Sequence, residues 1–132
     1  MNANVDRPRI RLIAFWVYTA LLVVATHIPN SVLPTIEFLW FDKIEHATAY
    51  GLWTMLLFMS GLLGENPLRV RAARALLWSS LFALADELLQ MIPALNRVAD
   101  PVDVIADVFG SACVVCAIWV RERRLKSRDR RA

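Results

Sequence analysis

The fold of this chain is decided by residues 42–63, DKIEHATAYGLWTMLLFMSGLL. Ionisable side chains stand only at the start of this stretch, and an apolar run follows them. The stretch is about as long as the roughly 20 residues that a helix needs to cross a bilayer. A charge near the centre of a bilayer costs about 2.5 to 3.5 kcal/mol on insertion scales, so charges attached to such a run indicate a functional site.

Three other segments have a similar length and composition, so we expect four membrane-spanning helices. The four windows are 12–28, 44–63, 72–92 and 102–120. No A-x-A-like cleavage site follows the first window, so we expect it to be retained as a span. The chain is 58% apolar, whereas soluble proteins are typically about 45–50% apolar. The sequence therefore predicts one all-α domain over residues 1–132, a four-transmembrane-helix bundle with a basic tail over 121–132.

Basic residues are confined to one side of the predicted bundle. They precede the first span, lie between the second and third, and follow the fourth, with Lys43 and Arg97 as the exceptions. By the positive-inside rule, both termini then lie in the cytoplasm. Many basic residues can also indicate nucleic-acid binding, but the basic tail here adjoins a span, where attraction to anionic lipid accounts for it. We therefore expect a multi-pass membrane protein with no nucleic-acid partner.

The polar ends of the second, third and fourth segments meet on the outer side if the segments alternate in direction. Each end carries polar residues three or four apart, which share a helix face. They are Asp42, His46 and Tyr50 in the second segment, Glu87 and Gln90 in the third, and Asp103 and Asp107 in the fourth. Ala106 and Gly110 continue the fourth segment as a pair of small residues that permits close helix approach.

Helix capping is a competing explanation for some of these residues. Asp42 with Glu45, and Asp100 with Asp103, have the spacing of a capping box, in which side chains bind the free N–H groups of the first turn. Capping leaves unexplained the polar residues inside the predicted helices, which are His46, Glu87, Gln90 and Asp107.

The predicted outer half carries eight carboxylates against Lys43 and Arg97. These carboxylates cannot all pair off, so some must be solvated, protonated or bound to a cation. Asp103 and Asp107 are the candidate ligands of a divalent cation, because hard cations bind carboxylate oxygens. His46 and Glu87 are the candidates for proton transfer. The sequence leaves open whether there is any catalysis.

In their order and spacing, these residues resemble the VanZ-like family of small bacterial membrane proteins. The matching signature is Asp42-Lys43-x-x-His46-x-x-x-Tyr50-x-Leu52, Glu87-x-x-Gln90, Arg97 and Asp103-x-x-x-Asp107-x-x-Gly110. Asp107 stands where the family motif commonly has Asn. The resemblance implies a protein of the bacterial cell envelope, in the inner membrane, and a link to resistance to the glycopeptide teicoplanin.

Three functions are open at this point. In the first, an outward-facing site binds or modifies a lipid-linked envelope precursor, an anionic lipid or a surface molecule, with Lys43 and Arg97 contacting an anionic head group. The site residues are Asp42, Lys43, His46, Tyr50, Glu87, Gln90, Arg97, Asp103 and Asp107. In the second, the same residues form an interhelical network of a non-catalytic structural or accessory bundle. In the third, the chain is a subunit of a transporter, which requires a homo-oligomer because four short helices enclose no route alone.

Overall fold

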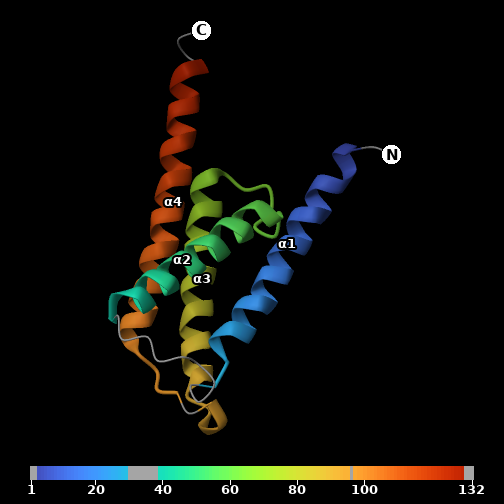
Figure 1. The fold of residues 1–132 in the computed structure, drawn as a ribbon. Helices are drawn as coiled ribbons and strands as arrows, with labels where there is room; N and C mark the ends of the chain where they lie inside the picture. The colour runs from blue at the N-terminus through green and yellow to red at the C-terminus, as the bar shows by residue number, and fades with distance from the viewer. Residues whose placement is uncertain (1–2, 30–38, 96, 130–132) are drawn as a thin grey trace.

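The structure is a computed structural model that describes residues 3–29, 39–95 and 97–129, and these ranges contain helices and no strands (Figure 1). The long helices are α1 (Ala3–Thr26), α2 (Leu39–Ser60), α3 (Leu68–Gln90) and α4 (Pro101–Asp129). A short 3₁₀ helix, η1 (Pro93–Leu95), follows α3. The predicted all-α class and its four long helices are confirmed for the described residues.

Helices α1 and α4 extend beyond the predicted windows. α1 begins nine residues before the window 12–28, at Ala3, and carries Pro8 in its first half. α4 continues through the basic tail as far as Asp129. Arg, Lys and Glu have high helix propensity, and Lys126 Nζ lies 2.7 Å from Glu122 Oε1 one turn earlier. The tail therefore extends the helix instead of ending it.

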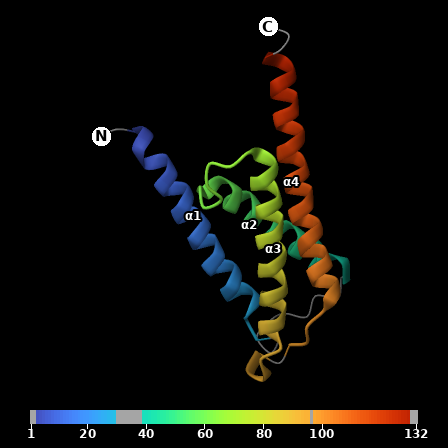
Figure 2. The ribbon, with the colours of Figure 1, turned by 180° about the vertical axis from the view of Figure 1, so that it is seen from behind.

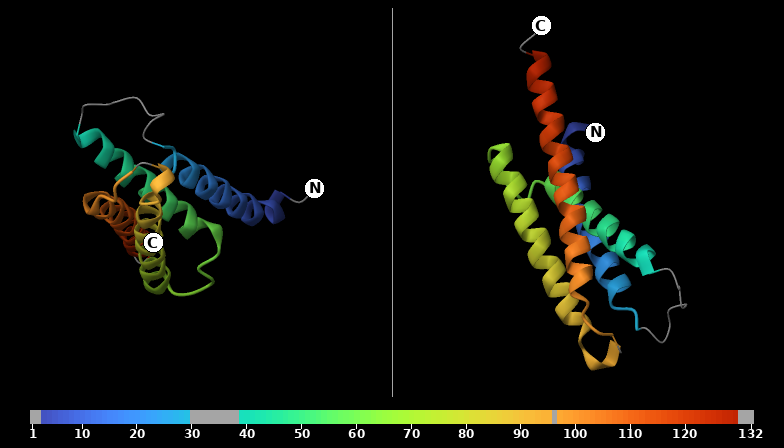
Figure 3. Two further views of the ribbon diagram at one scale, coloured as in Figure 1. Left: turned by 90° about the horizontal axis from the view of Figure 1, so that it is seen from below. Right: turned by 90° about the vertical axis from the view of Figure 1, so that its left-hand side faces the viewer.

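The helices are arranged with α3 and α4 side by side and antiparallel, as Figures 1 and 2 show. α2 crosses them obliquely and packs chiefly against α4, while α1 packs against α2 and leans away toward its N-terminal end. The start of α1, the α2–α3 connection and the end of α4 lie at one end of the bundle (Figures 1 and 3). η1 and the starts of α2 and α4 lie at the other end, so consecutive helices run in alternating directions.

Aromatic side chains join the first three helices. The rings of Trp53 in α2 and Phe82 in α3 stack with centroids 4.7 Å apart, and Phe15 of α1 lies 5.2 Å from Trp53. Trp53 Nε1 also donates a hydrogen bond to Thr19 Oγ1 at 3.0 Å. These contacts position α1 against α2 and α3.

The interior is unusually polar and the exterior unusually apolar. Three fully buried hydroxyl residues, Thr54, Ser79 and Ser111, lie within 2.6 to 2.9 Å of one another at the centre of α2, α3 and α4. Large apolar side chains face outward instead; they include Ile13, Leu21 and Val24 of α1, Leu77, Leu84 and Leu88 of α3, and Ile105 and Phe109 of α4. This distribution is the reverse of the one in a typical soluble protein.

The closest helix contact is between the backbones of α2 and α4. A Cβ atom added at Gly110 would lie only 1.9 Å from the carbonyl oxygen of Ala47. At Gly51, one turn along α2, an added Cβ would lie 3.2 Å from the carbonyl oxygen of Gly110. The close approach predicted at Gly110 is therefore confirmed, and no larger residue fits there without moving a helix.

Two helices of the described chain are long and apolar enough to cross a membrane, over Arg7–Thr26 and Pro101–Arg128. Polar and charged residues at the ends of α2 and α3 lower the mean hydropathy of these helices. The finding gives weak support to a membrane location. It does not confirm the predicted four-span bundle with cytoplasmic termini.

Gly110→Ala should destabilise the protein strongly, because its methyl group would overlap the Ala47 carbonyl. We expect a loss in the free energy of unfolding of about 3 kcal/mol, the upper end for overpacking, measured by denaturation in detergent. Gly51→Ala is the matched control, since its methyl group needs a shift of only a few tenths of an ångström. Equal stability of the two variants would contradict the close contact.

Candidate functional site

Lys43, near the start of α2, connects α2 with α4 and the segment before it. Its Nζ lies 3.0 Å from Asp42 Oδ2 and 2.7 Å from Asp100 Oδ2, and it also donates to Asp103 Oδ1. The Lys43 side chain is 19% exposed and that of Asp103 is 12% exposed. Charge-assisted hydrogen bonds at such sites are stronger than neutral ones. The ammonium group is therefore fully engaged by carboxylates of the protein.

His46 lies one turn deeper and contacts α4 through both ring nitrogens. Its Nδ1 is 3.0 Å from Asp107 Oδ1, and the Asp107 side chain is 2% exposed. Its Nε2 faces Asp42 Oδ1 at 3.9 Å and Asp103 Oδ2 at 3.8 Å, too far for hydrogen bonds. A proton on Nδ1, donated to Asp107, leaves the Nε2 lone pair directed at the two outer carboxylates.

Glu87 and Gln90 of α3 connect the loop before α4 with the end of α1. Glu87 Oε1 accepts a hydrogen bond from the backbone N–H of Asp100, and Glu87 Oε2 accepts one from Gln90 Nε2 at 3.3 Å. Gln90 Oε1 accepts from Arg97 Nη1 at 3.1 Å, while Arg97 Nε donates to the carbonyl oxygen of Ile28 at 3.1 Å. Arg97 therefore binds neutral oxygens, and within the described residues no carboxylate pairs with it.

Asp86 forms a second contact with α1 that the sequence did not indicate. The hydroxyl of Thr26 donates to Asp86 Oδ1 at 3.0 Å, and His27 Nδ1 lies 3.6 Å from the same oxygen. The Asp86 side chain is 3% exposed. This carboxylate thus fixes the C-terminal end of α1 against α3.

Tyr50 is placed in the core and not in the hydrogen-bonded network. It is 1% exposed, and its ring centroid lies 5.8 Å from that of Phe82. Within the described residues its buried hydroxyl has no hydrogen-bond partner. Its side chain contributes packing and leaves one buried donor unsatisfied.

Of the predicted site residues, the structure brings all but Tyr50 into one connected network. The sequence analysis missed the buried hydroxyls of Thr54, Ser79 and Ser111. A signal for them existed, because Thr54 and Ser111 lie four residues after Tyr50 and Asp107 and so continue the same helix faces. Ser79 lies two turns before Glu87 on the inner face of α3.

Negative charge exceeds positive charge in this network. The network contains two cations, Lys43 and Arg97, two histidines, His27 and His46, and six carboxylates, which are Asp42, Asp86, Glu87, Asp100, Asp103 and Asp107. Asp42 and Asp100 are about half exposed and can stay solvated. Burying the other four without partners is costly, so protons or a bound cation would stabilise the network.

A metal ion would find its ligands at Asp42, His46 and Asp103. One ligand atom from each of these residues lies within 4.8 Å of the others. The sequence analysis named Asp103 and Asp107 instead. The structure places Asp107 behind the imidazole, where it orients His46 in the way that carboxylates orient metal-binding histidines.

The contact with Lys43 also changes the titration of Asp100, which lies outside the predicted spans. The ammonium group of Lys43, and then the backbone N–H of Val102, hydrogen-bond the Asp100 carboxylate and lower its pKa from the ordinary value of 3.8. A carboxylate with a lowered folded-state pKa stabilises the protein above its unfolded-state pKa, and this contribution is lost as the pH falls through the folded-state value.

Comparison with known proteins gives one match. The family model described as VanZ/LLP1 matches residues 3–122, which is most of the chain. No curated protein and no solved structure matches the chain.

Asp100→Asn should lower the midpoint of thermal unfolding near neutral pH, because the charge that faces Lys43 is lost. The difference from wild type should shrink as the pH falls from 3.8, the ordinary pKa that applies to the unfolded chain, through the lower folded-state pKa of Asp100, because the wild-type carboxylate is then protonated in both states. Melting curves of both proteins across the acidic range measure it. A difference that stays constant with pH would contradict the Lys43–Asp100 ion pair.

Proposed function

The chain belongs to the VanZ/LLP1 family, and we propose that it is a multi-pass protein of the bacterial inner membrane with an outward-facing polar site. We further propose that the site binds a lipid-linked or surface molecule of the cell envelope, and that this activity is linked to glycopeptide resistance. In this proposal residues 1–132 form one membrane domain.

The distribution of side chains supports a membrane location for all four long helices. α2 and α3 are too polar to stand out by hydropathy, but their polar residues are buried: Thr54 and Ser79 bond each other across the two helices, and Glu87 bonds the segment before α4. Their exposed surfaces carry large apolar side chains such as Met55 and Leu84. A helix with its polar groups satisfied by neighbouring helices is compatible with a bilayer.

The two ends of the bundle support the orientation. The end that holds the α2–α3 connection and the end of α4 carries nearly all the basic residues (Figure 1). The network occupies the opposite end. By the positive-inside rule the basic end is cytoplasmic, so the network opens outward.

The observation that carries the ligand proposal is the group of unbonded donor atoms on Asp42, His46 and Asp103. Donor atoms that share one tetrahedral Zn²⁺ ion at about 2.1 Å lie about 3.4 Å apart. The separations of 3.8 and 3.9 Å from His46 Nε2 thus need only a slight contraction. A divalent cation there would offset the excess negative charge and keep open positions for a phosphate oxygen of the bound molecule.

A direct contact between Lys43 and an anionic head group is less well supported. Three carboxylates already bind the ammonium group, and an anion would have to approach those same carboxylates. A bridging cation removes this conflict, because it is attracted by the carboxylates and by the phosphate alike.

The alternative function is a structural or accessory bundle. The hydroxyl cluster of Thr54, Ser79 and Ser111 favours it, since these buried groups lie deeper in the bundle than the carboxylates and join three helices. In that case the network would fix helix register, as buried polar groups do in some bundles. The alternative predicts that substitutions of His46 deplete the protein from the membrane, whereas the ligand proposal predicts that the protein remains.

The proposed orientation predicts the activity of alkaline phosphatase fusions, because this enzyme is active only outside the cytoplasm. A fusion after Ala94 should be active, and fusions after Gly64 or at the C-terminus should be inactive. Enzyme activity normalised to the amount of fusion protein gives the result. The reverse pattern would overturn the orientation.

The cation proposal predicts that Zn²⁺ or Mn²⁺ stabilises the purified protein against unfolding and that a chelator reverses this. At a metal concentration about 100 times Kd, the gain is about 2.7 kcal/mol. Asp42→Asn and Asp103→Asn should abolish the gain, and thermal unfolding measures it. Asp42→Asn is the gentler test because the Asp42 side chain is 57% exposed.

Glu45→Gln is the matched control for these variants. It removes a carboxylate from the same turn of α2 without touching the three donor atoms, so its response to metal should equal that of wild type. If all the variants and the control respond alike, the metal binds elsewhere or only to surface charge, and the cation proposal fails.

A further inference from the structure

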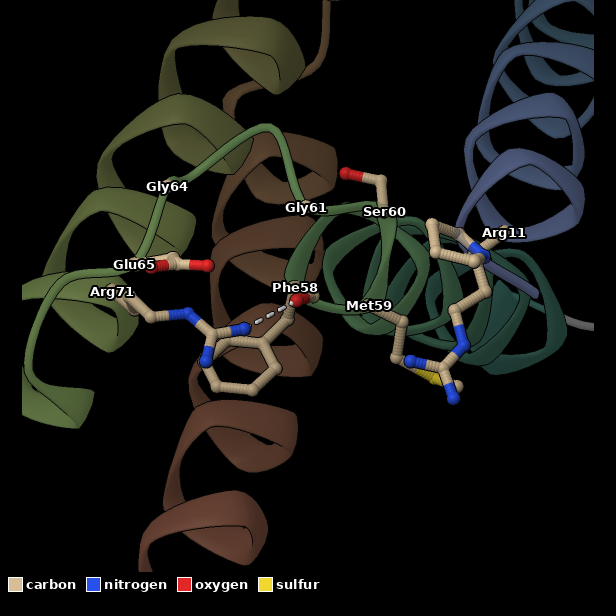
Figure 4. Close-up of a pocket in the computed structure, with 9 residues that line it drawn as sticks. Arg11, Phe58, Met59, Ser60, Gly61, Gly64, Glu65 and Arg71 are labelled. Carbon is tan, nitrogen blue, oxygen red and sulfur yellow. Dashed lines mark hydrogen bonds between the residues drawn. The ribbon is translucent and has the colours of Figure 1, made fainter. Parts of the chain in front are cut away.

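A hollow of about 420 Å³ lies at the end of the bundle opposite the polar network. Its walls come from the first half of α1, the end of α2, the α2–α3 connection and the start of α3 (Figure 4). The volume falls within the roughly 300 to 1,000 Å³ of small-molecule sites. No residue of the polar network lines it, so it is a separate place on the molecule.

Two arginines give the hollow a positive charge. Arg11 of α1 and Arg71 of α3 lie on opposite sides of it, with Phe58 and Met59 between them (Figure 4). Glu65 also contributes to the lining. Within the described residues, no ion pair joins Glu65 to either arginine. The hollow therefore suits an anion.

Arg71 is already held in a fixed position. Its Nη2 donates to the carbonyl oxygen of Phe58 at 3.0 Å, and its guanidinium carbon lies 4.3 Å from the centroid of the Phe58 ring. Its Nε is buried, and within the described residues no acceptor binds it. An unsatisfied buried donor is costly. Nε is closed to solvent, so an anion in the hollow would bind the other N–H groups of this guanidinium, as phosphate commonly does.

The rest of the lining suits a molecule that is partly apolar. Pro8, Phe58 and Met59 face the hollow together with the arginines. α1 diverges from the other helices on this side (Figures 1 and 2), and its residues Ile10 and Ile13 are about 60% exposed. An anionic group attached to hydrocarbon chains matches both the charged and the apolar surfaces. A free inorganic anion would leave the apolar surface uncovered.

We propose that this hollow binds the phosphate head group of an anionic membrane lipid at the cytoplasmic face. Arg71 hydrogen-bonds the phosphate, Arg11 attracts it from the opposite side, and the glycerol and acyl portions lie along Phe58 and Met59. The site depends on the membrane location of the chain. It does not depend on what the outer network binds, so either proposal can fail while the other stands.

The test compares lipid binding by two pairs of variants. Arg11→Gln and Arg71→Gln each remove a lining charge, while Arg9→Gln and Arg69→Gln remove the same charge from neighbouring positions outside the hollow. Each purified protein is reconstituted in phosphatidylcholine with increasing phosphatidylglycerol. Bound phosphatidylglycerol is measured by native mass spectrometry, and thermal unfolding is followed in parallel. Arg71→Lys keeps the charge without the planar guanidinium, and it replaces Arg71→Gln if the latter does not fold.

We expect wild type and the two controls to retain phosphatidylglycerol over phosphatidylcholine. Arg11→Gln and Arg71→Gln should bind it about tenfold more weakly, the usual loss for a charge-assisted hydrogen bond. Equal losses of phosphatidylglycerol binding in all four variants would show that the lipid is attracted by the overall positive charge of the protein, and this result would overturn the site. No preference for phosphatidylglycerol in wild type would also overturn it. A parallel titration with inorganic phosphate separates the two sources of a phosphate group. If inorganic phosphate alone raises the midpoint of thermal unfolding as much as the lipid does, the lipid assignment is overturned.

Discussion

The backbone contact between Gly110 and Ala47 is the constraint on which the rest of the structure depends. A glycine at position 110 lets α4 approach α2 so closely that an added methyl group would overlap the Ala47 carbonyl oxygen. Toward one end of the bundle, His46 beside Ala47 then meets Asp107, one turn before Gly110. Toward the other end, Ser111 beside Gly110 meets Thr54, two turns after Ala47. The polar network is thus a consequence of how closely two helices approach.

The polar interior also determines which environment suits the protein. In water, the four buried carboxylates of Asp86, Glu87, Asp103 and Asp107 would be a poor substitute for apolar side chains, because breaking any pair leaves a charge without a partner. In a bilayer, apolar side chains gain little from facing inward, and helices associate through small residues and hydrogen bonds. The exposed apolar surfaces and the close packing at Gly110 both fit the second situation. The same network includes the carboxylate oxygens and imidazole nitrogen of Asp42, His46 and Asp103, which lie close enough together to bind a cation. The same residues can therefore join the helices and form a binding site.

Much of the fold followed from the sequence, and the partners of individual side chains did not. Apolar windows and helical spacing predicted four helices, the convergence of polar residues at one end of the bundle and the small-residue contact at Gly110. The partner of each charge depends on how far α2 is tilted across α4, and no periodicity encodes this angle. For that reason the sequence left open whether Lys43 contacts an anionic head group or carboxylates of the protein, and in the structure three carboxylates bind it. Asp107 was a candidate metal ligand, and its carboxylate lies against His46. Thr54 and Ser111 were missed because single hydroxyl residues in an apolar run do not stand out, although they continue the faces of Tyr50 and Asp107.

The central claim is that close contact between α2 and α4 couples His46 to the buried Asp107. A double-mutant cycle with His46→Gln, Asp107→Asn and the double variant, followed by the free energy of unfolding in detergent, measures this coupling. The account predicts a coupling energy of about 1.5 to 3 kcal/mol, as for other hydrogen bonds to charged groups. If the effects of the two single substitutions sum to the effect of the double substitution within about 0.5 kcal/mol, the two side chains do not interact. That result would contradict the account.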